Sequence, residues 1–85
     1  MSTHHSHPAI LKRLKRTEGH LRSIIKMLED GRSCMELAQQ LQAVEKAIAN
    51  AKKTLIHDHI DHCLADGKKD SSRDIKELKE ISKYL

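Results

Sequence analysis

The stretch from residue 33 to residue 64 constrains the fold of this chain more than any other part. It contains neither proline nor glycine, the residues that most often end a helix. Its apolar side chains recur at intervals of three and four residues, as on one face of a helix. They are Leu37, Leu41, Val44, Ile48, Ala51 and Leu55. The pattern predicts one long helix, and a near-heptad seam of this length requires a packing partner.

Composition narrows the fold class to a small all-α protein. The chain has 85 residues, enough for one domain spanning residues 1–85 with a modest core. Tyr84 is the only aromatic residue apart from the histidines, so the core must be aliphatic. No strand pattern, signal-peptide pattern or long uncharged apolar run is present. We therefore expect a soluble, cytoplasmic protein with no membrane partner, in which the two cysteines are reduced thiols.

Two further helices should flank the long one. The three helices are expected at about residues 8–29, 33–64 and 72–84, after a flexible tail at residues 1–7. Pro8 suits the first turn of the first helix. Ser33 and Glu36 have the capping-box spacing that opens the central helix. Gly19 lies inside the first helix, where a close helix contact or a nearby ligand could explain it.

The two ends of the central helix carry soft metal ligands. Cys34 stands at its beginning, while His59 and Cys63 lie one turn apart on one face near its end. Cys34 and His59 are separated by roughly 38 Å at 1.5 Å per residue, so one straight helix cannot bring them to the same ion. Two such helices, antiparallel about a two-fold axis near residues 47 and 48, would bring Cys34 of one chain to His59 and Cys63 of the other. The apolar residues expected at that axis are Val44, Ile48 and Ala51. The spacing predicts an obligate dimer with two equivalent sites between the chains.

Two thiolates and one imidazole make a soft-to-intermediate donor set. Trigonal coordination by these groups suits Cu(I), and a further imidazole suits tetrahedral Zn(II) or planar Ni(II). The N-terminal tail supplies three candidates for that imidazole, His4, His5 and His7. A helical hairpin would place this tail at the His59 end of its own chain. A core histidine and a buried thiol would explain His59 and Cys63 taken singly, but not their joint arrangement with Cys34.

Basic side chains gather on the side of the first helix opposite to its apolar face. They are Lys12, Arg13, Lys15, Arg16, Arg22 and Lys26, and Lys52 and Lys53 could extend the surface. The net charge of +4, with neutral histidines, favours a polyanionic partner moderately. Taken alone, the pattern fits a solvated helix face slightly better than a nucleic-acid surface. No helix-turn-helix, zinc-finger or basic-zipper pattern is present, so DNA contacts would be mainly to phosphates and groove shape.

Three segments resemble the CsoR/RcnR family of small helical metal sensors, the copper-sensing operon repressors and the nickel–cobalt repressors. They are RLKRTEGHLRSIIKMLEDGRSC, LAQQLQAVEKAI and DHIDHC, and the resemblance covers nearly the whole chain. It implies a three-helix protomer, a dimer through the central helix with a four-helix core, and a dimer-of-dimers tetramer. It also implies operator DNA as the partner of the basic face, and repression of a metal-efflux operon that metal binding relieves.

Carried over position by position, the resemblance implies that Cys34, His59 and Cys63 match the ligand triad of the copper sensors. In those sensors a glutamate near the third helix supports the ligands. The residue that corresponds to it here is Glu77 or Glu80.

Other positions bear on which metal binds. His20 stands where the family usually has Gln, and in mid-helix it fits a structural role or a contact to a ligand. Ser33 stands where copper sensors tend to have Tyr. These departures weigh against Cu(I), and a histidine at position 4 or 5 is similar to the nickel and cobalt branch. The resemblance slightly favours Ni(II) or Co(II) over Cu(I) as the one ion per protomer.

Two other functions stay open. A metal-storage or chaperone protein would share the ligands but not the basic face. A thiol-based redox or persulfide sensor would use Cys34 and Cys63 across the dimer, although persulfide-sensing relatives lack the histidine that stands here at position 59. An enzyme is not expected, because no glycine-rich loop or nucleophile–base constellation is present.

Overall fold

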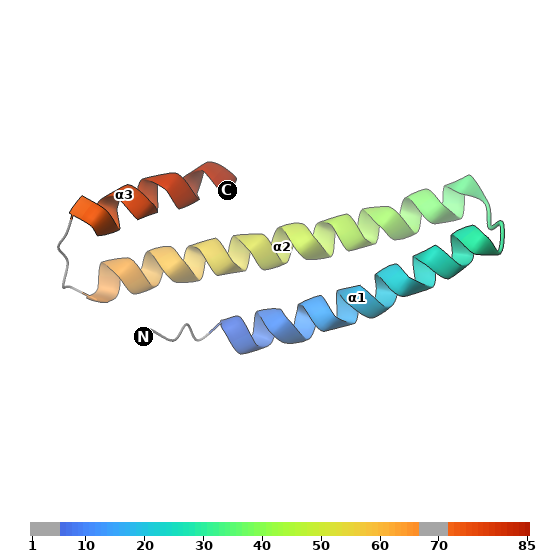
Figure 1. The fold of residues 1–85 in the computed structure, drawn as a ribbon, viewed down its shortest axis with the longest axis horizontal. Coiled ribbons are helices and arrows are strands. Elements are labelled where there is room, and N and C mark those ends of the chain that lie inside the picture. Colours follow the sequence, from blue (N-terminus) through green and yellow to red (C-terminus); the bar gives the residue numbers. More distant parts are fainter. Residues whose placement is uncertain (1–5, 67–71) are drawn as a thin grey trace.

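The computed structural model describes residues 6–66 and 72–85, with side chains described at residues 6–62 and 75–85. Its helices are α1 (His7–Glu29), α2 (Cys34–Asp66) and α3 (Ser72–Ile81), followed by a short 3-10 helix, η1 (Ser82–Tyr84). No strand occurs in these described ranges. The prediction of an all-α protomer of three helices, with a long central one, is confirmed (Figure 1).

A tight turn makes α1 and α2 an antiparallel hairpin. The backbone N–H of Arg32 donates to the carbonyl of Met27 at 3.0 Å, and that of Gly31 donates to the carbonyl of Leu28 at 3.1 Å. This pair of bonds is the Schellman motif that ends many helices. Gly31 has a φ of +72°, a left-handed backbone that glycine adopts without strain. The chain therefore reverses between Glu29 and Cys34.

Side chains in this turn hold the beginning of α2. The backbone N–H of Glu36 donates to Oγ of Ser33 at 3.2 Å, as the capping-box pattern predicts. The Glu36 carboxylate departs from that pattern, because it accepts hydrogen bonds from the Arg32 guanidinium at 2.6 and 3.2 Å. This hydrogen bonding lowers the pKa of Glu36 and raises the pKa of Arg32. The contacts fix the turn that precedes Cys34.

The core lies between α1 and α2, where Ile24 packs with Leu37 and Val44, and Met27 lies at the edge of the cluster. The other buried apolar side chains among those described are Ile10, Ala51 and Ile56. Both Val44 and Ala51 were expected at a two-fold axis. That expectation is wrong, because both side chains are already buried inside the protomer.

The apolar seam of α2 therefore divides into two stripes. The buried stripe consists of Leu37, Val44 and Ala51. The exposed stripe consists of Leu41, Ile48 and Leu55, with 47%, 49% and 37% of the residue surface accessible. The first stripe is covered within the protomer, and the second is left open to solvent.

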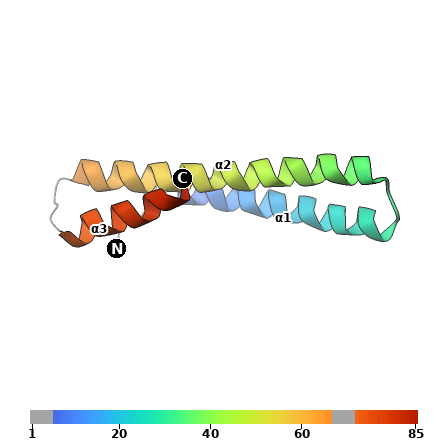
Figure 2. The same ribbon diagram turned by 90° about the horizontal axis from the view of Figure 1, so that it is seen from above.

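The third helix, α3, folds back along the C-terminal half of α2, on a different side of α2 from α1 (Figure 1, Figure 2). The molecule is elongated, measuring 55 × 23 × 14 Å. None of the helices in the described residues combines the length and the apolar character needed to span a bilayer.

A Cβ atom added at Gly19 would meet nothing within 4 Å among the described residues, so the protomer shows no close helix contact there.

Candidate functional site

The proposed ligands Cys34 and His59 lie at opposite ends of α2. Cys34 is the first residue of the helix, and its thiol is exposed and not in a disulfide. The His59 side chain is largely buried, with 19% of its surface accessible. Because α2 is continuous from Cys34 to Asp66, the separation of roughly 38 Å that helical rise dictates applies within one protomer.

A carboxylate from α3 approaches the imidazole at this end of α2. Nε2 of His59 lies 4.0 Å from Oε1 of Glu77. Glu77 and Glu80 were the two candidates for a supporting glutamate, and Glu77 is the one that approaches His59. The side chains of both glutamates are exposed.

Several predicted ligands fall outside the described part of the structure. Cys63 belongs to α2, but its side chain is not among those described, and His4 and His5 lie in residues 1–5. Among the described side chains, no group of three or more His, Cys, Asp or Glu residues is arranged to hold a metal ion.

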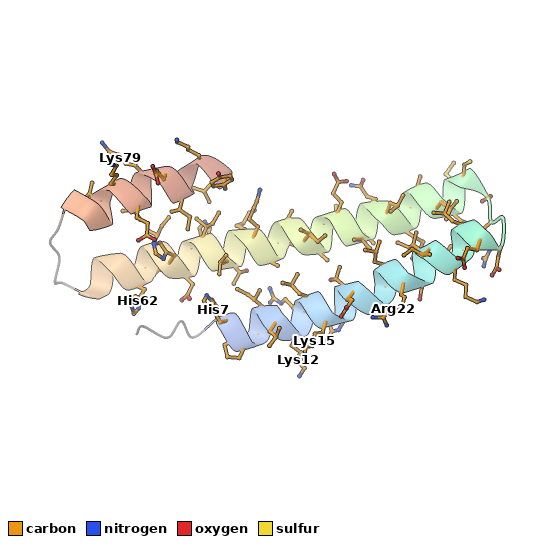
Figure 3. The ribbon with its side chains drawn as sticks, in the orientation of Figure 1. His7, Lys12, Lys15, Arg22, His62 and Lys79 are labelled. Atoms are coloured by element: carbon orange, nitrogen blue, oxygen red, sulfur yellow. The ribbon has the colours of Figure 1, made fainter. Side chains whose placement is uncertain are left out.

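The beginning of α1 meets the His59 end of α2, as a helical hairpin requires. The Ser6 hydroxyl donates a 2.8 Å hydrogen bond to Oδ2 of Asp58, a residue 52 positions further along the chain. His7 opens α1, and His62 points from α2 towards the side on which α1 begins (Figure 3). Residues 6 and 7, expected in a flexible tail, thus belong to the folded protomer. Neither Ser6 nor Asp58 is a predicted site residue.

A second side-chain contact joins the two helices farther along the hairpin. Nε2 of His20 lies 2.6 Å from the side-chain oxygen of Gln40, and both side chains are partly buried. His20 therefore links α1 to α2, which agrees with a structural role.

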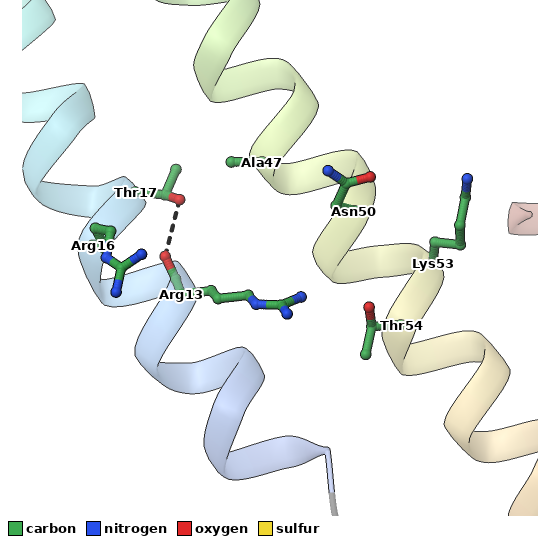
Figure 4. Close-up of a pocket in the computed structure, with 7 residues that line it drawn as sticks. All are labelled: Arg13, Arg16, Thr17, Ala47, Asn50, Lys53 and Thr54. Atoms are coloured by element: carbon green, nitrogen blue, oxygen red, sulfur yellow. Dashed lines mark hydrogen bonds between the residues drawn. The ribbon is translucent and has the colours of Figure 1, made fainter.

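The predicted DNA-binding residues separate into two sets. The first set lines a groove between α1 and α2 with a volume of about 480 Å³ (Figure 4). Its lining residues are Arg13, Arg16, Thr17, Ala47, Asn50, Lys53 and Thr54. The hydroxyl of Thr17 donates to the carbonyl of Arg13 at 3.0 Å. The groove is walled by cations and polar groups from both helices, and the threonines and Asn50 were missed because they carry no charge.

The second set lies on the outer side of α1. Lys12, Lys15 and Arg22 point away from α2 (Figure 3). Arg22 pairs with Glu18 at 3.5 Å, but both side chains are exposed, so the pair contributes little to stability. Lys52 is exposed on α2 and is not part of the groove lining. The basic surface is therefore an outer helix face together with a groove.

The three-helix fold agrees with that of a solved structure of a metal-responsive regulator. The family of metal-sensitive transcriptional repressors matches residues 6–84, and the chain belongs to this family. Repressors of this family bind operator DNA, and the homologues are transcriptional repressors rather than enzymes.

Individual relatives sense different metals. The copper-sensing transcriptional repressor CsoR of Bacillus subtilis is 41% identical over 76 residues, which cover 87% of this chain and 75% of that protein. The CsoR of Mycobacterium ulcerans is 39% identical over 57 residues, 67% of this chain and 49% of that protein, so the match spans about half of its length. The solved structure of the nickel-responsive transcriptional regulator InrS superposes with a TM-score of 0.82 at 28% identity, covering 100% of this chain and 99% of that one.

Proposed function

We propose that this protein binds operator DNA in its metal-free form and leaves the DNA when Ni(II), Co(II) or Cu(I) binds between two protomers. The ligands are Cys34 of one chain with His59 and Cys63 of the other. The observation that carries the proposal is the exposed stripe of α2. Cys34, Leu41, Ile48 and Leu55 follow one another at seven-residue intervals, and all four are exposed.

A second copy of the chain is the proposed cover for this stripe. If two α2 helices pack antiparallel with Ile48 near the two-fold axis, Cys34 of each chain lies at the His59 end of the other. Exposed apolar residues of α1 extend the same self-association surface. They are Leu11, Leu14, Leu21, Ile25 and Leu28. The result is a four-helix core, from which a dimer-of-dimers tetramer is built. A monomeric mass by light scattering at micromolar concentration would contradict this assembly.

The donor atoms suit a thiophilic transition metal. Metal-bound imidazoles usually direct their second ring nitrogen to a carboxylate, which fixes the ring orientation. The Glu77 carboxylate lies 4.0 Å from Nε2 of His59, which supports such a role for Glu77 when a metal is bound. With Cys34 and Cys63 the site has two sulfurs and one nitrogen, which suits Cu(I). A tail imidazole at His4 or His5 adds the fourth donor that suits Ni(II). We favour Ni(II) or Co(II) over Cu(I).

The basic surface supplies the DNA contacts. Arg13, Arg16 and Lys53 of the groove provide cations for backbone phosphates, and hydroxyl and amide groups beside them provide neutral donors. The outer side of α1 adds Lys12 and Lys15. Since phosphate contacts dominate such binding, it should weaken steeply as salt is raised.

The division of the groove between two helices suggests how DNA is released. A bound ion would hold its thiolate and imidazole ligands within about 2.3 Å of one centre. The end of α2, the beginning of α1 and the Cys34 end of the second chain would then be drawn together. Movement of α1 along α2 separates Arg13 and Arg16 from Lys53, so the groove loses its fit to phosphate. By linkage, DNA must weaken metal binding by the same factor.

Fluorescence anisotropy tests the proposal, with a labelled duplex selected from random sequence by the metal-free protein. Wild type should bind the duplex and release it on addition of Ni(II), Co(II) or Cu(I). The variant Cys34→Ala should bind the duplex but not release it, whereas Met35→Ala, altered at the neighbouring exposed residue, should behave as wild type. Unchanged release from Cys34→Ala would overturn the proposed site.

The same assay distinguishes the two other functions. A thiol-based redox sensor would be released by oxidant in the absence of metal, and its chains would be cross-linked on non-reducing gels. A metal-storage or chaperone protein would bind metal without binding the duplex.

A further inference from the structure

We propose that the hydrogen bond between His20 and Gln40 is a positioning contact for DNA binding, because it holds the two walls of the basic groove at the spacing that fits backbone phosphates. The bond between Ser6 and Asp58 has this role at the other end of the groove. The inference rests on the function proposed above, in which the groove binds phosphate. It gives a role in DNA binding to four residues that do not line the groove.

Half-buried residues show which side of α1 faces the groove. Thr17 lines the groove and is half-buried. Ser6 precedes Thr17 by 11 residues and His20 follows it by three, and both are also half-buried. Eleven residues make about three whole turns, and residues three apart are neighbours on a helix surface. Ser6, Thr17 and His20 therefore lie along one side of α1.

The facing side of α2 is identified in the same way. Ala47 and Thr54 line the groove, and both are half-buried. Gln40 precedes Ala47 by seven residues, or about two turns, and Asp58 follows Thr54 by four residues, or about one turn. Both of these residues are half-buried as well. The four residues therefore lie along the side of α2 that faces α1.

One hydrogen bond between the helices lies at each end of the groove. Nε2–H of His20 donates to the side-chain oxygen of Gln40 at 2.6 Å, because an amide oxygen can only accept. The Ser6 hydroxyl donates to Oδ2 of Asp58 at 2.8 Å. The two bonds are separated by roughly 21 Å of helical rise along α1. All the lining residues of the groove lie between them in both helices.

The charges of the groove explain why its walls need such bonds. Its cations are Arg13, Arg16 and Lys53, and no carboxylate is among the described residues that line it. None of these cations forms an ion pair with another residue in the described ranges. Arg13 extends from α1 towards α2 (Figure 4). Like charges repel, so cations on two facing helices tend to separate the walls. The bond between His20 and Gln40 opposes this separation without placing a carboxylate in the groove.

A groove of fixed width should bind phosphate better than one whose walls move apart. A preorganised site does not have to be ordered by its ligand, so less of the interaction energy is lost on binding. Loss of the bond at one end lets the walls separate there. Cations from the two helices then no longer reach the same stretch of DNA backbone. The number of phosphate contacts, and not only the affinity, should therefore depend on His20 and Gln40.

The test measures how the metal-free protein binds the selected, labelled duplex at a series of salt concentrations. The variants are His20→Ala, Gln40→Ala and the double variant. Each single variant should bind about two- to tenfold more weakly, the change equivalent to one net hydrogen bond. The slope of log K against log salt concentration should decrease by about 0.9, the value for one phosphate contact. The double variant should match the single ones, because both substitutions remove the same contact.

Three further variants serve as rescue, control and second test. His20→Gln keeps a side-chain N–H that can donate to Gln40, so it should bind as wild type does. Gln39→Ala, at the exposed neighbour of Gln40, is the matched control and should also bind as wild type does. Ser6→Ala should weaken binding and reduce the slope as Gln40→Ala does. It removes no helix cap, because the Ser6 side chain makes no capping hydrogen bond. Melting temperatures verify that each variant is folded during the measurement.

The outcomes separate this inference from the function on which it rests. A merely structural contact would change the melting temperatures of His20→Ala and Gln40→Ala but leave the affinity and salt slope of the folded protein unchanged, which would overturn the positioning role. Equal losses of affinity in His20→Gln and His20→Ala would also overturn it, because the imidazole would then act without Gln40. If Arg13→Ala and Lys53→Ala both leave the slope unchanged, the groove binds no phosphate, and the inference fails together with that part of the proposed function. If these two variants reduce the slope but the His20 and Gln40 variants do not, the inference alone is wrong.

Discussion

Nε2 of His59 and Oε1 of Glu77 lie 4.0 Å apart, although the two residues belong to different helices. The contact joins the ligand-bearing end of α2 to α3. If His59 binds the metal as proposed, α3 would take part in the site without supplying a ligand, because a carboxylate beside a metal-bound imidazole helps to orient the ring.

Removal of the Glu77 carboxylate should therefore weaken metal binding. Glu77→Gln is expected to lower the affinity for Ni(II) or Cu(I) by about 10- to 100-fold, the usual cost of losing a group that orients a metal-bound histidine. Glu80→Gln, at a second exposed glutamate of the same helix, is the matched control and should leave the affinity unchanged. Equal effects of the two substitutions would show that the charge of α3, and not the contact to His59, determines the metal affinity.

The two glycines of α1 and its turn should respond oppositely to alanine. Gly31→Ala should lower the free energy of unfolding by about 1–2 kcal/mol, because its φ of +72° is left-handed. Gly19→Ala should raise that free energy by about 0.5–1 kcal/mol, because Gly19 is helical and has open space where a Cβ would stand. Urea denaturation of the metal-free protein measures both. Destabilisation by Gly19→Ala would reveal a close contact made only in the assembly.

The bond between Arg32 and Glu36 should make stability depend on acidity. Hydrogen bonding to Arg32 lowers the pKa of Glu36 below its ordinary value of 4.5. The ionised carboxylate therefore stabilises the fold above that value, and the contribution is lost as the pH falls through the lowered pKa. Melting temperatures of wild type and Glu36→Gln should differ near neutral pH and converge in acid. Arg32→Gln should show the same dependence on pH. A difference in melting temperature from wild type that persists at low pH would contradict this role of the Arg32–Glu36 pair.

Phosphate contacts in the groove should make DNA binding depend on the salt concentration. Each phosphate contact that is lost should reduce the slope of log K against log salt concentration by about 0.9. Arg13→Ala and Lys53→Ala, one from each wall of the groove, should each reduce the slope and weaken binding to all sequences alike. Lys83→Ala, beyond α3 in η1, should leave the slope unchanged. An unaltered slope in both groove variants would exclude the groove as a phosphate site.

Periodicity and local signals were sufficient to predict the architecture. The absence of helix breakers predicts α2, and the Schellman motif completes the reversal that a helical hairpin requires. Periodicity could not decide which apolar stripe of α2 faces α1. The buried stripe begins at Leu37 and the exposed stripe at Leu41, only four residues later. Which stripe faces α1 depends on how α2 is rotated about its own axis in the hairpin. Val44 and Ala51 were placed at the wrong surface for that reason.

Chemistry and spacing predict candidate ligands at the ends of α2, and the family resemblance adds Glu77 beside them, but neither predicts the contact between Ser6 and Asp58. Ser6 is expected in a flexible tail because residues 1–7 have no apolar periodicity. Its partner Asp58 is 52 positions away, and no local pattern connects the two. The neutral residues of the groove were missed in the same way, because their position beside Arg13 depends on how α1 packs on α2.

The central claim is that each metal site is shared between two chains, and a mixing experiment tests it most directly. Cys34→Ala and His59→Ala are refolded together in equal amounts, and tight Ni(II) sites are counted by titration. Each variant alone should show none. A mixed dimer, however, pairs the intact Cys34 of one chain with the intact His59 of the other. Random pairing should then restore about one quarter of the wild-type number of sites, as two-fold symmetry dictates. Recovery of no sites in the mixture, or full binding by either variant alone, would contradict a shared site.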